Sequence, residues 1–442
     1  MAKQNHSVAH TSPQTTSLIT PHTPFGLIGR KLAHSWSSKI HAQLGSTPYT
    51  HYELEPNQLE AFIASDVWQG LNVTIPYKVD VARLADKVSD AVQAVGAANT
   101  LMRLPHGALY AENTDVQGFD WMLEHFCTTQ LDTAHAATLL AHKKVLVLGS
   151  GGASRAICYV LKQLRALPVV VSRTGSTTYT NLLPQHQDAV LIVNTTPVGM
   201  YPHDNNSPLH ISTLQALPQL KGVLDIVYNP LHTYLCQQAQ QLGIPAQTGL
   251  SMLVAQAWAS SKLWQQRELP KDCIKHIEKN LQQHIANIAF IGMPGSGKTS
   301  TGKKLARLLK RPFVDLDNAA ALACGMPVAS YINRFGEDAF RQIETEVLAQ
   351  YSHESGLIIS CGGGVVTRPE NYNLLHRNSV VVMIDRPLNE LSVENRPLSQ
   401  AQGIQTLANQ RMDLYYSWSD HVVHTTGSAQ TDAEATMHLL GF

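Results

Sequence analysis

Several common features are scarce in this sequence of 442 residues. Charged side chains make up only 15%, the 33 basic and 33 acidic residues balance, and no basic block stands out. A neutral chain of this kind offers little attraction to nucleic acid or to an anionic membrane surface. No apolar run reaches the roughly 18 residues expected of a membrane-spanning helix. We therefore expect neither nucleic acid nor a membrane among the partners.

Cysteine is also sparse. The six cysteines are too far apart for a CxxC metal-binding pattern and too few for a disulfide framework, so we expect reduced thiols. The N-terminal segment is polar and lacks the apolar core of a signal peptide. Residues 1–24 are therefore predicted to be a disordered tail, and the protein is predicted to be cytoplasmic.

Short apolar runs alternate with segments long enough for helices. The runs are rich in Val, Ile and Leu and often end in glycine, as in FGLIG, KVLVLGS and NIAFIG. This alternation is typical of buried parallel strands with crossover helices, so the predicted fold class is α/β. The length favours about two to four domains. A helical pattern with Ile274, Ile277, Leu281 and Ile285 on one face precedes the main boundary, which we place near His284.

The strongest local signal is a match to G-x-x-x-x-G-K-[ST] between an apolar run and a helical pattern. In such a loop, backbone N–H groups surround phosphate oxygens, the lysine reaches the β- and γ-phosphates, and the hydroxyl residue ligates Mg²⁺. A glycine-rich turn with an incidental lysine is the weaker explanation, because the match and its context are complete. The predicted ATP-binding residues are Gly292, Gly295, Ser296, Gly297, Lys298 and Thr299, with Thr299 on the metal.

Two carboxylates follow the next strand. Asp315 and Asp317 stand at the end of the run FVDLD, which places them beside the phosphate loop. One can hold Mg²⁺ and the other can take a proton from an attacking hydroxyl. Glycines 362–364 follow a further strand and would let a small ligand approach the backbone, although glycine turns without a function are common.

Arg341 lies in a helical pattern downstream. The predicted buried face of that helix contains Phe340, Ile343 and Val347, with Arg341 off it. Arg341 either binds an anion or merely pairs with a glutamate one helical turn away, Glu337 or Glu344.

Together these motifs make residues 285–442 resemble shikimate kinase, since the P-loop, D-x-D, F-R-x-x-E, GGG, R-P-L and R-x-x-x-Y occur in the family's order. The resemblance implies a P-loop parallel α/β domain that phosphorylates shikimate with ATP and Mg²⁺. It implies that Lys298 and Asp317 are catalytic, that Asp315 supports the metal, and that Arg396 is a lid arginine over the transferred phosphoryl group. The implied substrate contacts are Asp317, Arg341, Gly363, Gly364 and Arg411. The stretch from Leu391 to Arg411 is shorter than the family pattern.

A second glycine turn follows the run KVLVL. Gly149, Gly151, Gly152 and Ala153 fit the start of a dinucleotide-binding turn, but Ser154 replaces the third glycine, so a ligand-free βα turn is an alternative. The next strand ends in Ser172, Arg173 and Thr174, where an NAD site would have an acidic residue. An arginine with hydroxyl neighbours suits a 2′-phosphate, so we predict NADP.

Polar residues in the segment before this turn could perform the chemistry. Lys78 follows a strand that carries Asn72 and Thr74, and Asp115 follows another. A lysine held by a carboxylate can protonate a developing alkoxide, but most such residues are solvated charges. Ser35 and Ser37 could bind a carboxylate or cap the helix that follows.

Residues 25–283 resemble shikimate dehydrogenase through AHSWSSKIH, GLNVTIPYK, VGAANT, ENTDVQG, NTTPVGM, DIVYNP and GLSMLVAQAW. The resemblance implies a two-lobed enzyme with Lys78 and Asp115 as the catalytic pair, and Arg173 and Thr174 on the 2′-phosphate of NADP. The implied substrate contacts are Ser35, Ser37, Asn72, Thr74, Asn99, Tyr228 and Gln256. The interval from Arg173 to Asn194 is shorter than the family pattern, as if part of a helix and a strand were missing.

The two resemblances predict a bifunctional enzyme that reduces 3-dehydroshikimate with NADPH and phosphorylates shikimate with ATP. The predicted parts are a substrate-binding lobe at 25–120, completed by helices in 244–283, a Rossmann lobe at 121–243 and a kinase domain at 284–442. One alternative is a quinate or shikimate oxidoreductase fused to another small-molecule kinase. Another is a metabolite sensor without turnover, which the catalytic residues argue against.

Overall fold

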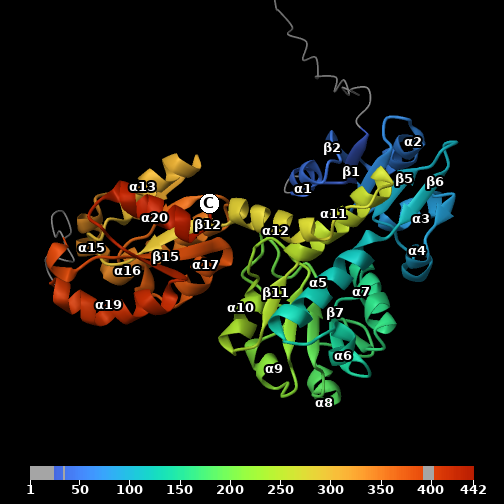
Figure 1. Ribbon diagram of the computed structural model, residues 1–442. Coiled ribbons are helices and arrows are strands. Elements are labelled where there is room, and N and C mark those ends of the chain that lie inside the picture. Colours follow the sequence, from blue (N-terminus) through green and yellow to red (C-terminus); the bar gives the residue numbers. More distant parts are fainter. Residues whose placement is uncertain (1–23, 33–34, 392–402) are drawn as a thin grey trace, which may run out of the picture.

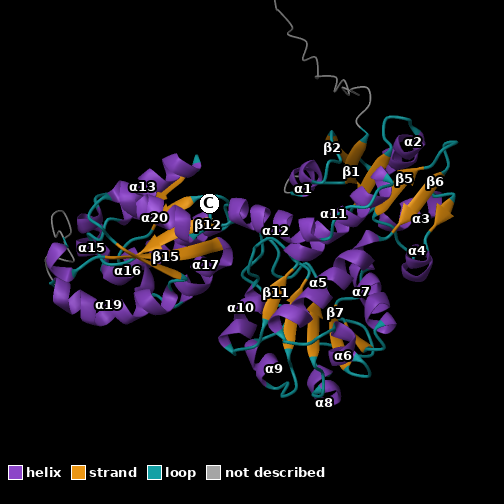
Figure 2. Cartoon of the chain, viewed as in Figure 1, coloured by secondary structure: helices purple, strands orange, loops and turns teal. Residues whose placement is uncertain are grey.

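The computed structural model describes residues 24–32, 35–391 and 403–442. Three sheets follow one another along this described part of the chain, and helices pack on each of them (Figures 1 and 2). The predicted tail lies outside the described residues except for Pro24. The α/β class predicted from the sequence is confirmed.

The first sheet has the order β2-β1-β3-β5-β6-β4 and is mixed. Strand β1 is parallel to β2 and β3, as the apolar runs predicted, but β5 pairs antiparallel with β3 and with β6. The connection from β5 to β6 is too short for a crossover helix, which forces the antiparallel arrangement. The strands are β1 Phe25–Gly29, β2 Tyr49–Glu53, β3 Gly70–Val73, β4 Lys87–Val88, β5 Thr100–Arg103 and β6 Leu109–Glu112. The helices are α1 Ser37–Gln43, α2 Leu59–Ala64, α3 Lys78–Leu84 and α4 Asp90–Val95.

The second sheet is parallel and has the order β11-β10-β9-β7-β8. Only the short helix α8 lies between β8 and β9, and β8 is an edge strand, which agrees with the short interval noted in the sequence. The strands are β7 Lys144–Leu148, β8 Leu167–Val171, β9 Leu191–Asn194, β10 Gly222–Asp225 and β11 Ala246–Thr248. The helices are α5 Thr114–Gln130, α6 Ala136–Leu140, α7 Gly152–Gln163, α8 Leu182–His186, α9 Ile211–Gln215 and α10 Tyr234–Gln241.

Two helices tie these sheets together and lead to the third. Helix α11 (Leu250–Gln265) packs closely on α5, because Gly118 of α5 has no side chain. A Cβ there would lie 2.8 Å from the Met252 carbonyl oxygen of α11. Its far end reaches the first sheet, where Trp264 Nε1 donates to the Leu101 carbonyl at 2.9 Å. Helix α12 (Asp272–Ile285) buries Ile274, Ile277, Leu281 and Ile285, as predicted, and runs directly into β12 (Figure 1).

The third sheet is parallel, with the order β13-β14-β12-β15-β16. Apolar clusters on its two faces bury alternate residues of β12, with Ala289 and Ile291 on one face and Ile288 and Phe290 on the other. The strands are β12 Asn287–Ile291, β13 Phe313–Asp315, β14 Ile358–Ser360, β15 Ser379–Asp385 and β16 His421–His424. The helices are α13 Lys298–Leu309, α14 Leu316–Ala323, α15 Val328–Phe335, α16 Glu337–Ser352, α17 Glu370–Asn378, α19 Ile404–Trp418 and α20 Ala429–Leu439.

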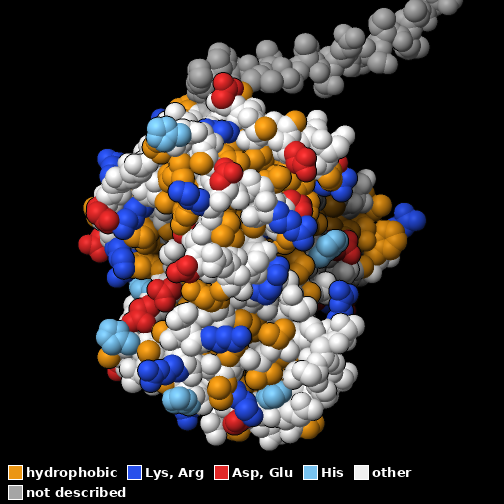
Figure 3. Space-filling view, turned by 90° about the vertical axis from the view of Figure 1, so that its right-hand side faces the viewer, with side chains coloured by type: hydrophobic (Ala, Val, Ile, Leu, Met, Phe, Trp, Pro, Cys, Tyr) orange, Lys and Arg blue, Asp and Glu red, His pale blue; other side chains and the backbone are white. Residues whose placement is uncertain are grey.

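The surface fits the balanced composition. On the face drawn in Figure 3, basic and acidic side chains are interspersed, and apolar and uncharged groups lie between them. Among the described residues no helix is both long and apolar enough to span a membrane.

Candidate active sites

The structure brings Lys78 and Asp115 into direct contact. Lys78 opens α3 just after β3, and Asp115 lies in the first turn of α5 just after β6. The Lys78 Nζ atom donates to Asp115 Oδ2 at 2.6 Å, and the two side chains keep 23% and 13% of their surface exposed. The pair is therefore anchored in the protein yet reachable from outside. An ammonium group held in this way can donate a proton to a bound carbonyl oxygen.

Asn99 and Gln256 complete a cluster around this pair. Asn99 Nδ2 donates to the other Asp115 oxygen at 2.8 Å and lies 3.4 Å from Gln256 Oε1. The orientation of the Asn99 amide is fixed because its oxygen accepts the Thr114 N–H at 2.7 Å. Four segments distant in sequence thus meet at one place, as the sequence predicted for these residues.

Asn72 is buried, and its side-chain amide forms hydrogen bonds with four protein groups. Its oxygen accepts bonds from His41 Nε2 at 2.8 Å and Tyr49 Oη at 2.9 Å, and its nitrogen donates to Thr100 at 3.2 Å and Ser260 at 2.9 Å. These four bonds use the full hydrogen-bonding capacity of the buried amide. Asn72 thus supports the residues around the cluster, and its contact with substrate stays a prediction.

The sequence analysis did not single out His41 and Tyr49, the partners of Asn72. The two rings stack with centroids 4.4 Å apart. Burial lowers the pKa of His41 to about 3, so the imidazole is neutral and the network around Asn72 carries no charge. His41 ends the motif AHSWSSKIH and Tyr49 lies outside the quoted motifs, but the roles of both depend on contacts made across the fold.

The remaining predicted substrate contacts border this region. Ser35 Oγ accepts the Ser37 N–H at 3.2 Å, but the N-cap residue of α1 is Trp36, so neither serine caps the helix as its N-cap residue; the Ser37 side chain is buried. Trp36, between them, and Tyr228 pack against the same apolar cluster, and burial raises the pKa of the Tyr228 phenol. Thr74 is half-buried at the end of β3.

The glycine turn after β7 has room for a ligand. Gly149 has φ +105°, and a side chain there would strike Thr195. A Cβ at Gly151 or Gly152 would meet no atom within 4 Å, so the turn faces open space at the start of α7. The dipole and free N–H groups of such a helix start suit a pyrophosphate.

The ends of strands β7 and β8 form the rest of the predicted cofactor site. Ala153 lies in the first turn of α7, and Ser172, Arg173 and Thr174 follow β8. Arg173 and Thr174 are exposed at the carboxyl edge of the sheet and are free to meet a 2′-phosphate. These residues fit NADP in charge and position.

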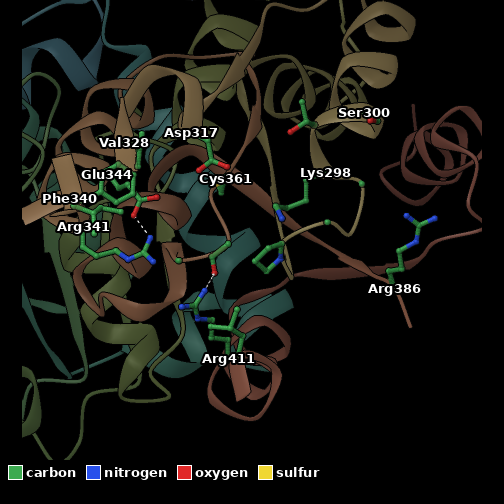
Figure 4. A pocket seen from close by; sticks show the side chains of 18 residues that line it. Lys298, Ser300, Asp317, Val328, Phe340, Arg341, Glu344, Cys361, Arg386 and Arg411 are labelled. Carbon is green, nitrogen blue, oxygen red and sulfur yellow. Dashed lines mark hydrogen bonds and ion pairs between the residues drawn. The ribbon is translucent and has the colours of Figure 1, made fainter. Parts of the chain in front are cut away.

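A cavity of about 470 Å³ lies over the carboxyl edge of the third sheet. In Figure 4, Arg341 and Glu344 lie at one end, Lys298 and Ser300 lie toward the other, and Asp317 is between them. The lining includes the predicted residues Gly295, Gly297, Lys298, Thr299, Asp317, Arg341, Gly363, Gly364 and Arg411.

The phosphate loop has the predicted form. Gly292, Gly295 and Gly297 have positive φ angles of 137°, 86° and 106°, which only glycine adopts readily. The buried Lys298 folds over the loop, and its Nζ atom donates to the carbonyls of Gly292 and Met293 at 2.9 Å each. Ser296 is buried within the loop. The loop thus leads into α13, and Gly295, Gly297, Lys298 and Thr299 line the cavity.

Thr299 and Asp315 meet at the position expected for Mg²⁺. Thr299 Oγ1 donates to Asp315 Oδ2 at 2.8 Å and lies 3.1 Å from Ser360 Oγ, a residue the sequence analysis did not select. Hard oxygen donors of this kind beside a phosphate loop fit Mg²⁺, which keeps several waters and phosphate ligands. Among the described residues no group of three or more His, Cys, Asp or Glu side chains could hold a metal alone.

Arg341 is buried, with 6% of its surface exposed, so the prediction that it lies off the buried face of α16 is wrong. It donates to Glu337 at 2.8 Å and also pairs with Glu344, as the pairing alternative predicted, and it also lines the cavity, so anion binding stays open. Helix α16 lies between the core and the cavity, and both of its sides are therefore covered. A side chain on Gly364 would collide with the Arg341 guanidinium, which explains the third glycine.

Arg411 approaches the cavity from α19. Its Nη1 donates to the Gly363 carbonyl at 3.0 Å, and the Tyr415 hydroxyl donates to the same carbonyl. Arg341 and Arg411 thus place two guanidinium groups, both largely buried, on one cavity. Planar guanidinium forks bind carboxylates in a bidentate way.

Two further residues line the cavity, Glu344, which was expected only as a pairing partner of Arg341, and Arg386, which was not predicted. Burial raises the pKa of the Glu344 carboxyl, and Arg341 opposes that effect. Arg386 lines the opposite end of the cavity and lies 3.6 Å from Glu390 (Figure 4). Arg386 directly follows the apolar strand β15, and this position could have indicated it as a site residue. The predicted lid residue Arg396 lies outside the described residues.

Comparison with known proteins gives separate matches for the N-terminal and the C-terminal part of the chain. Residues 27–101 match the family model of the shikimate dehydrogenase substrate binding domain, and residues 294–440 match that of shikimate kinase. The chain is 32% identical over 289 residues to a shikimate dehydrogenase (NADP(+)) of Synechocystis sp., covering 58% of this chain and 96% of that protein.

Two further relatives agree. A shikimate dehydrogenase (NADP(+)) of Clostridium perfringens is 34% identical over 281 residues, which are 58% of this chain and 98% of that protein. The crystal structure of a chorismate mutase/shikimate 5-dehydrogenase fusion protein from Clostridium acetobutylicum has a TM-score of 0.53 and 31% identity, covering 60% of this chain and 98% of that chain.

Proposed function

Because the chain belongs to the shikimate dehydrogenase family and also carries a shikimate kinase domain, we propose that it reduces 3-dehydroshikimate to shikimate and then phosphorylates shikimate at its 3-hydroxyl. Bound NADPH would supply a hydride to the first reaction, and bound MgATP would supply a phosphoryl group to the second. The two reactions would form consecutive steps of one biosynthetic route.

The dehydrogenase proposal rests on the Lys78–Asp115 pair. With the substrate carbonyl beside it, the Lys78 ammonium donates its proton to the carbonyl oxygen, and Asp115 holds the ammonium in place through the 2.6 Å bond. Asn99 and Gln256 supply amide groups that can bind the ring hydroxyls. Ser35, Ser37 and Tyr228 supply hydroxyls that can bind the substrate carboxylate.

The kinase proposal rests on one cavity that holds a phosphate loop at one end and two arginines at the other. Arg341 and Arg411 bind the substrate carboxylate, which turns the ring hydroxyls toward Asp317. Asp317 orients the attacking hydroxyl and accepts its proton, while Lys298 and Thr299 hold the triphosphate and its Mg²⁺. Arg396 remains the proposed lid arginine.

The proposed domain limits follow the three sheets. We keep 25–120 and the helices in 244–283 as the substrate-binding lobe, 121–243 as the Rossmann lobe, and 284–442 as the kinase domain. The sheets support this division, although the short strand β11 (Ala246–Thr248) belongs to the second sheet, so the return to the first lobe begins with α11.

Separate assays of the two reactions test this function. Lys78→Ala should abolish reduction of 3-dehydroshikimate and spare phosphorylation, and Lys298→Ala should do the reverse. The exposed lysines Lys87 and Lys303 provide matched alanine controls that should leave both rates unchanged. A wild-type protein that prefers quinate, or that binds shikimate without consuming NADPH or ATP, would contradict the proposal.

A further inference from the structure

The kinase domain touches the dehydrogenase through a buried ion pair, Asp204–Arg377, with Asn205 and His353 beside it. These four residues are here called the domain clamp. Arg377 Nη1 lies 3.4 Å from Asp204 Oδ2, and His353 Nδ1 lies 2.9 Å from the same oxygen. The second Arg377 nitrogen donates to Asn205 Oδ1. The side chains of Arg377 and Asp204 keep only 5% and 1% of their surface exposed. Arg377 and His353 come from the kinase domain, and Asp204 and Asn205 come from the Rossmann lobe.

Hydrogen bonds around the domain clamp fix the end of α17 on the dehydrogenase. The His232 N–H donates to the Arg377 carbonyl at 3.0 Å, and the Leu231 N–H donates to Asn378 Oδ1 at 2.8 Å. Gln237 Nε2, on α10, donates to the Asn373 carbonyl at 3.2 Å. Because these bonds involve backbone groups on both sides, the contact is a specific docking geometry rather than a loose apposition.

The clamped residues continue a segment that borders the glycine turn. After β9, the Thr195 N–H donates to the Leu148 carbonyl at 2.9 Å, and a Cβ on Gly149 would lie 2.8 Å from Thr195 Oγ1. The chain then exposes Val198 and Met200, at 36% and 45%, before it reaches Asp204. Exposed apolar side chains beside a dinucleotide turn are suited to cover a bound ring. This stretch, residues 195–206, is here called the cofactor loop.

The cofactor loop is held from both ends by different domains. On the Rossmann side, Asn194 Nδ2 donates to Asp225 at 2.9 Å, and the Tyr201 N–H donates to the Asn229 carbonyl at 3.1 Å. On the kinase side, the domain clamp holds Asp204 and Asn205. If Arg377 lost its charge, Asp204 would be a buried carboxylate without its cation, a situation that destabilises proteins strongly. The position of the cofactor loop thus depends on the kinase domain.

We propose that Arg377, although it belongs to the kinase domain, is a positioning residue for the dehydrogenase, because it fixes the cofactor loop against the glycine turn through Asp204 and Asn205. This inference rests on the proposed NADPH-dependent reaction. It makes the dehydrogenase dependent on the docked kinase domain, whereas no residue of α17 lines the kinase cavity.

The test compares Arg377→Gln, Arg377→Lys and Asp204→Asn in the full-length chain with the control Arg307→Gln, an exposed arginine on α13. We expect Arg377→Gln to raise the dissociation constant and the KM for NADPH roughly tenfold, because a broken buried ion pair frees the loop, with less effect on kcat. Arg377→Lys should give a smaller effect, because it keeps the charge but loses the contact with Asn205. KM values of the kinase for ATP and shikimate should stay unchanged.

Direct titration of NADPH by its fluorescence separates this inference from the proposed function, since binding is measured without turnover. If NADPH binds wild type and all variants equally, the inference is overturned. Parallel losses of both activities in Arg377→Gln and Arg377→Lys, with NADPH affinity retained, would mark a general folding defect and would overturn it as well. The double variant Asp204→Asn, Arg377→Gln should be no worse than Arg377→Gln alone, whereas additive losses would speak against the clamp.

Discussion

The dehydrogenase cluster and the kinase cavity differ in how much charge they hold. Around Lys78 and Asp115 the supporting groups are neutral, being the amides of Asn99 and Gln256 and the network under them. In the kinase cavity, by contrast, arginine, lysine, aspartate and glutamate side chains face one another. If both sites take the same small acid, as proposed, the difference reflects the reactions rather than the ligand.

Proton donation to a carbonyl requires one acid at a fixed position; Asp115 holds Lys78 there, and the neutral amides around the pair add no competing charge. Phosphoryl transfer develops charge on several oxygens, so it requires cations around the triphosphate and the acceptor. The charge of each site therefore follows from its chemistry. Four changes test this comparison: three alter activity, in order of decreasing expected effect, and one alters stability.

The largest effect is expected for Arg341→Met in the kinase cavity. Glu344, with 12% of its side chain exposed, would lose its cation, and the substrate carboxylate would lose a partner. We expect kcat/KM for shikimate phosphorylation to fall about a thousandfold, while the dehydrogenase is unaffected. Arg334→Met, at an exposed arginine of α15, is the control. A kinase that kept a tenth of its activity would place the carboxylate elsewhere.

Asp115→Asn tests the Lys78–Asp115 ion pair of the dehydrogenase cluster. The amide keeps the shape but cannot hold the Lys78 ammonium by charge, so kcat for reduction should fall about a hundredfold and the kinase should be unchanged. The exposed Asp120, on the same helix, gives the control Asp120→Asn. An increase in KM at constant kcat would mean that Asp115 only binds substrate.

Asp225 is a buried carboxyl group whose hydrogen-bond partners are neutral, in contrast to Glu344, which is paired with Arg341. Burial raises its pKa from 3.8 to about 7, although Val227, Thr233 and Asn194 donate hydrogen bonds to it. Between these values the folded protein binds more protons than the unfolded chain, so the free energy of unfolding falls as pH rises. Asp225→Asn should remove that slope, which amounts to about 4 kcal/mol over the full range. Urea unfolding between pH 4 and 8 measures it, and an unchanged slope would assign the proton to another group.

The smallest effect is expected for Arg386→Ala. Arg386 lies at the phosphate-loop end of the cavity, with 23% of its side chain exposed (Figure 4). We expect KM for ATP to rise about fivefold, as for a partly solvated charge contact, with KM for shikimate unchanged. The reverse pattern would move Arg386 to the acceptor side. Arg307→Ala serves as the control.

Much of the fold followed from local patterns. The apolar runs predicted the strands β1, β3, β7, β8, β9, β10, β12, β14 and β15, and the apolar face of α12 was predicted residue by residue. The antiparallel pairing of β5 was not predicted, because pairing direction depends on the length of the connection and on neighbours far along the chain. The sites were partly predictable for the same reason. Sequence motifs indicated Lys78, Asp115 and Lys298. Arg341 was wrongly predicted to lie off the buried face of α16, because apolar periodicity indicates only one covered side of a helix and α16 is covered on two sides.

The sequence alone determined which short segments form strands, helices and glycine turns, and which polar residues stand at their ends. Glycine spacing and apolar periodicity act over only a few positions, so a local stretch of sequence contains them. The tertiary structure decided which of those residues touch. It saturated the Asn72 amide, buried Arg341 between two glutamates, and joined Arg377 of one domain to Asp204 of another. Such contacts depend on burial and on charges brought together from distant segments, and neither quantity is a property of a local stretch of sequence.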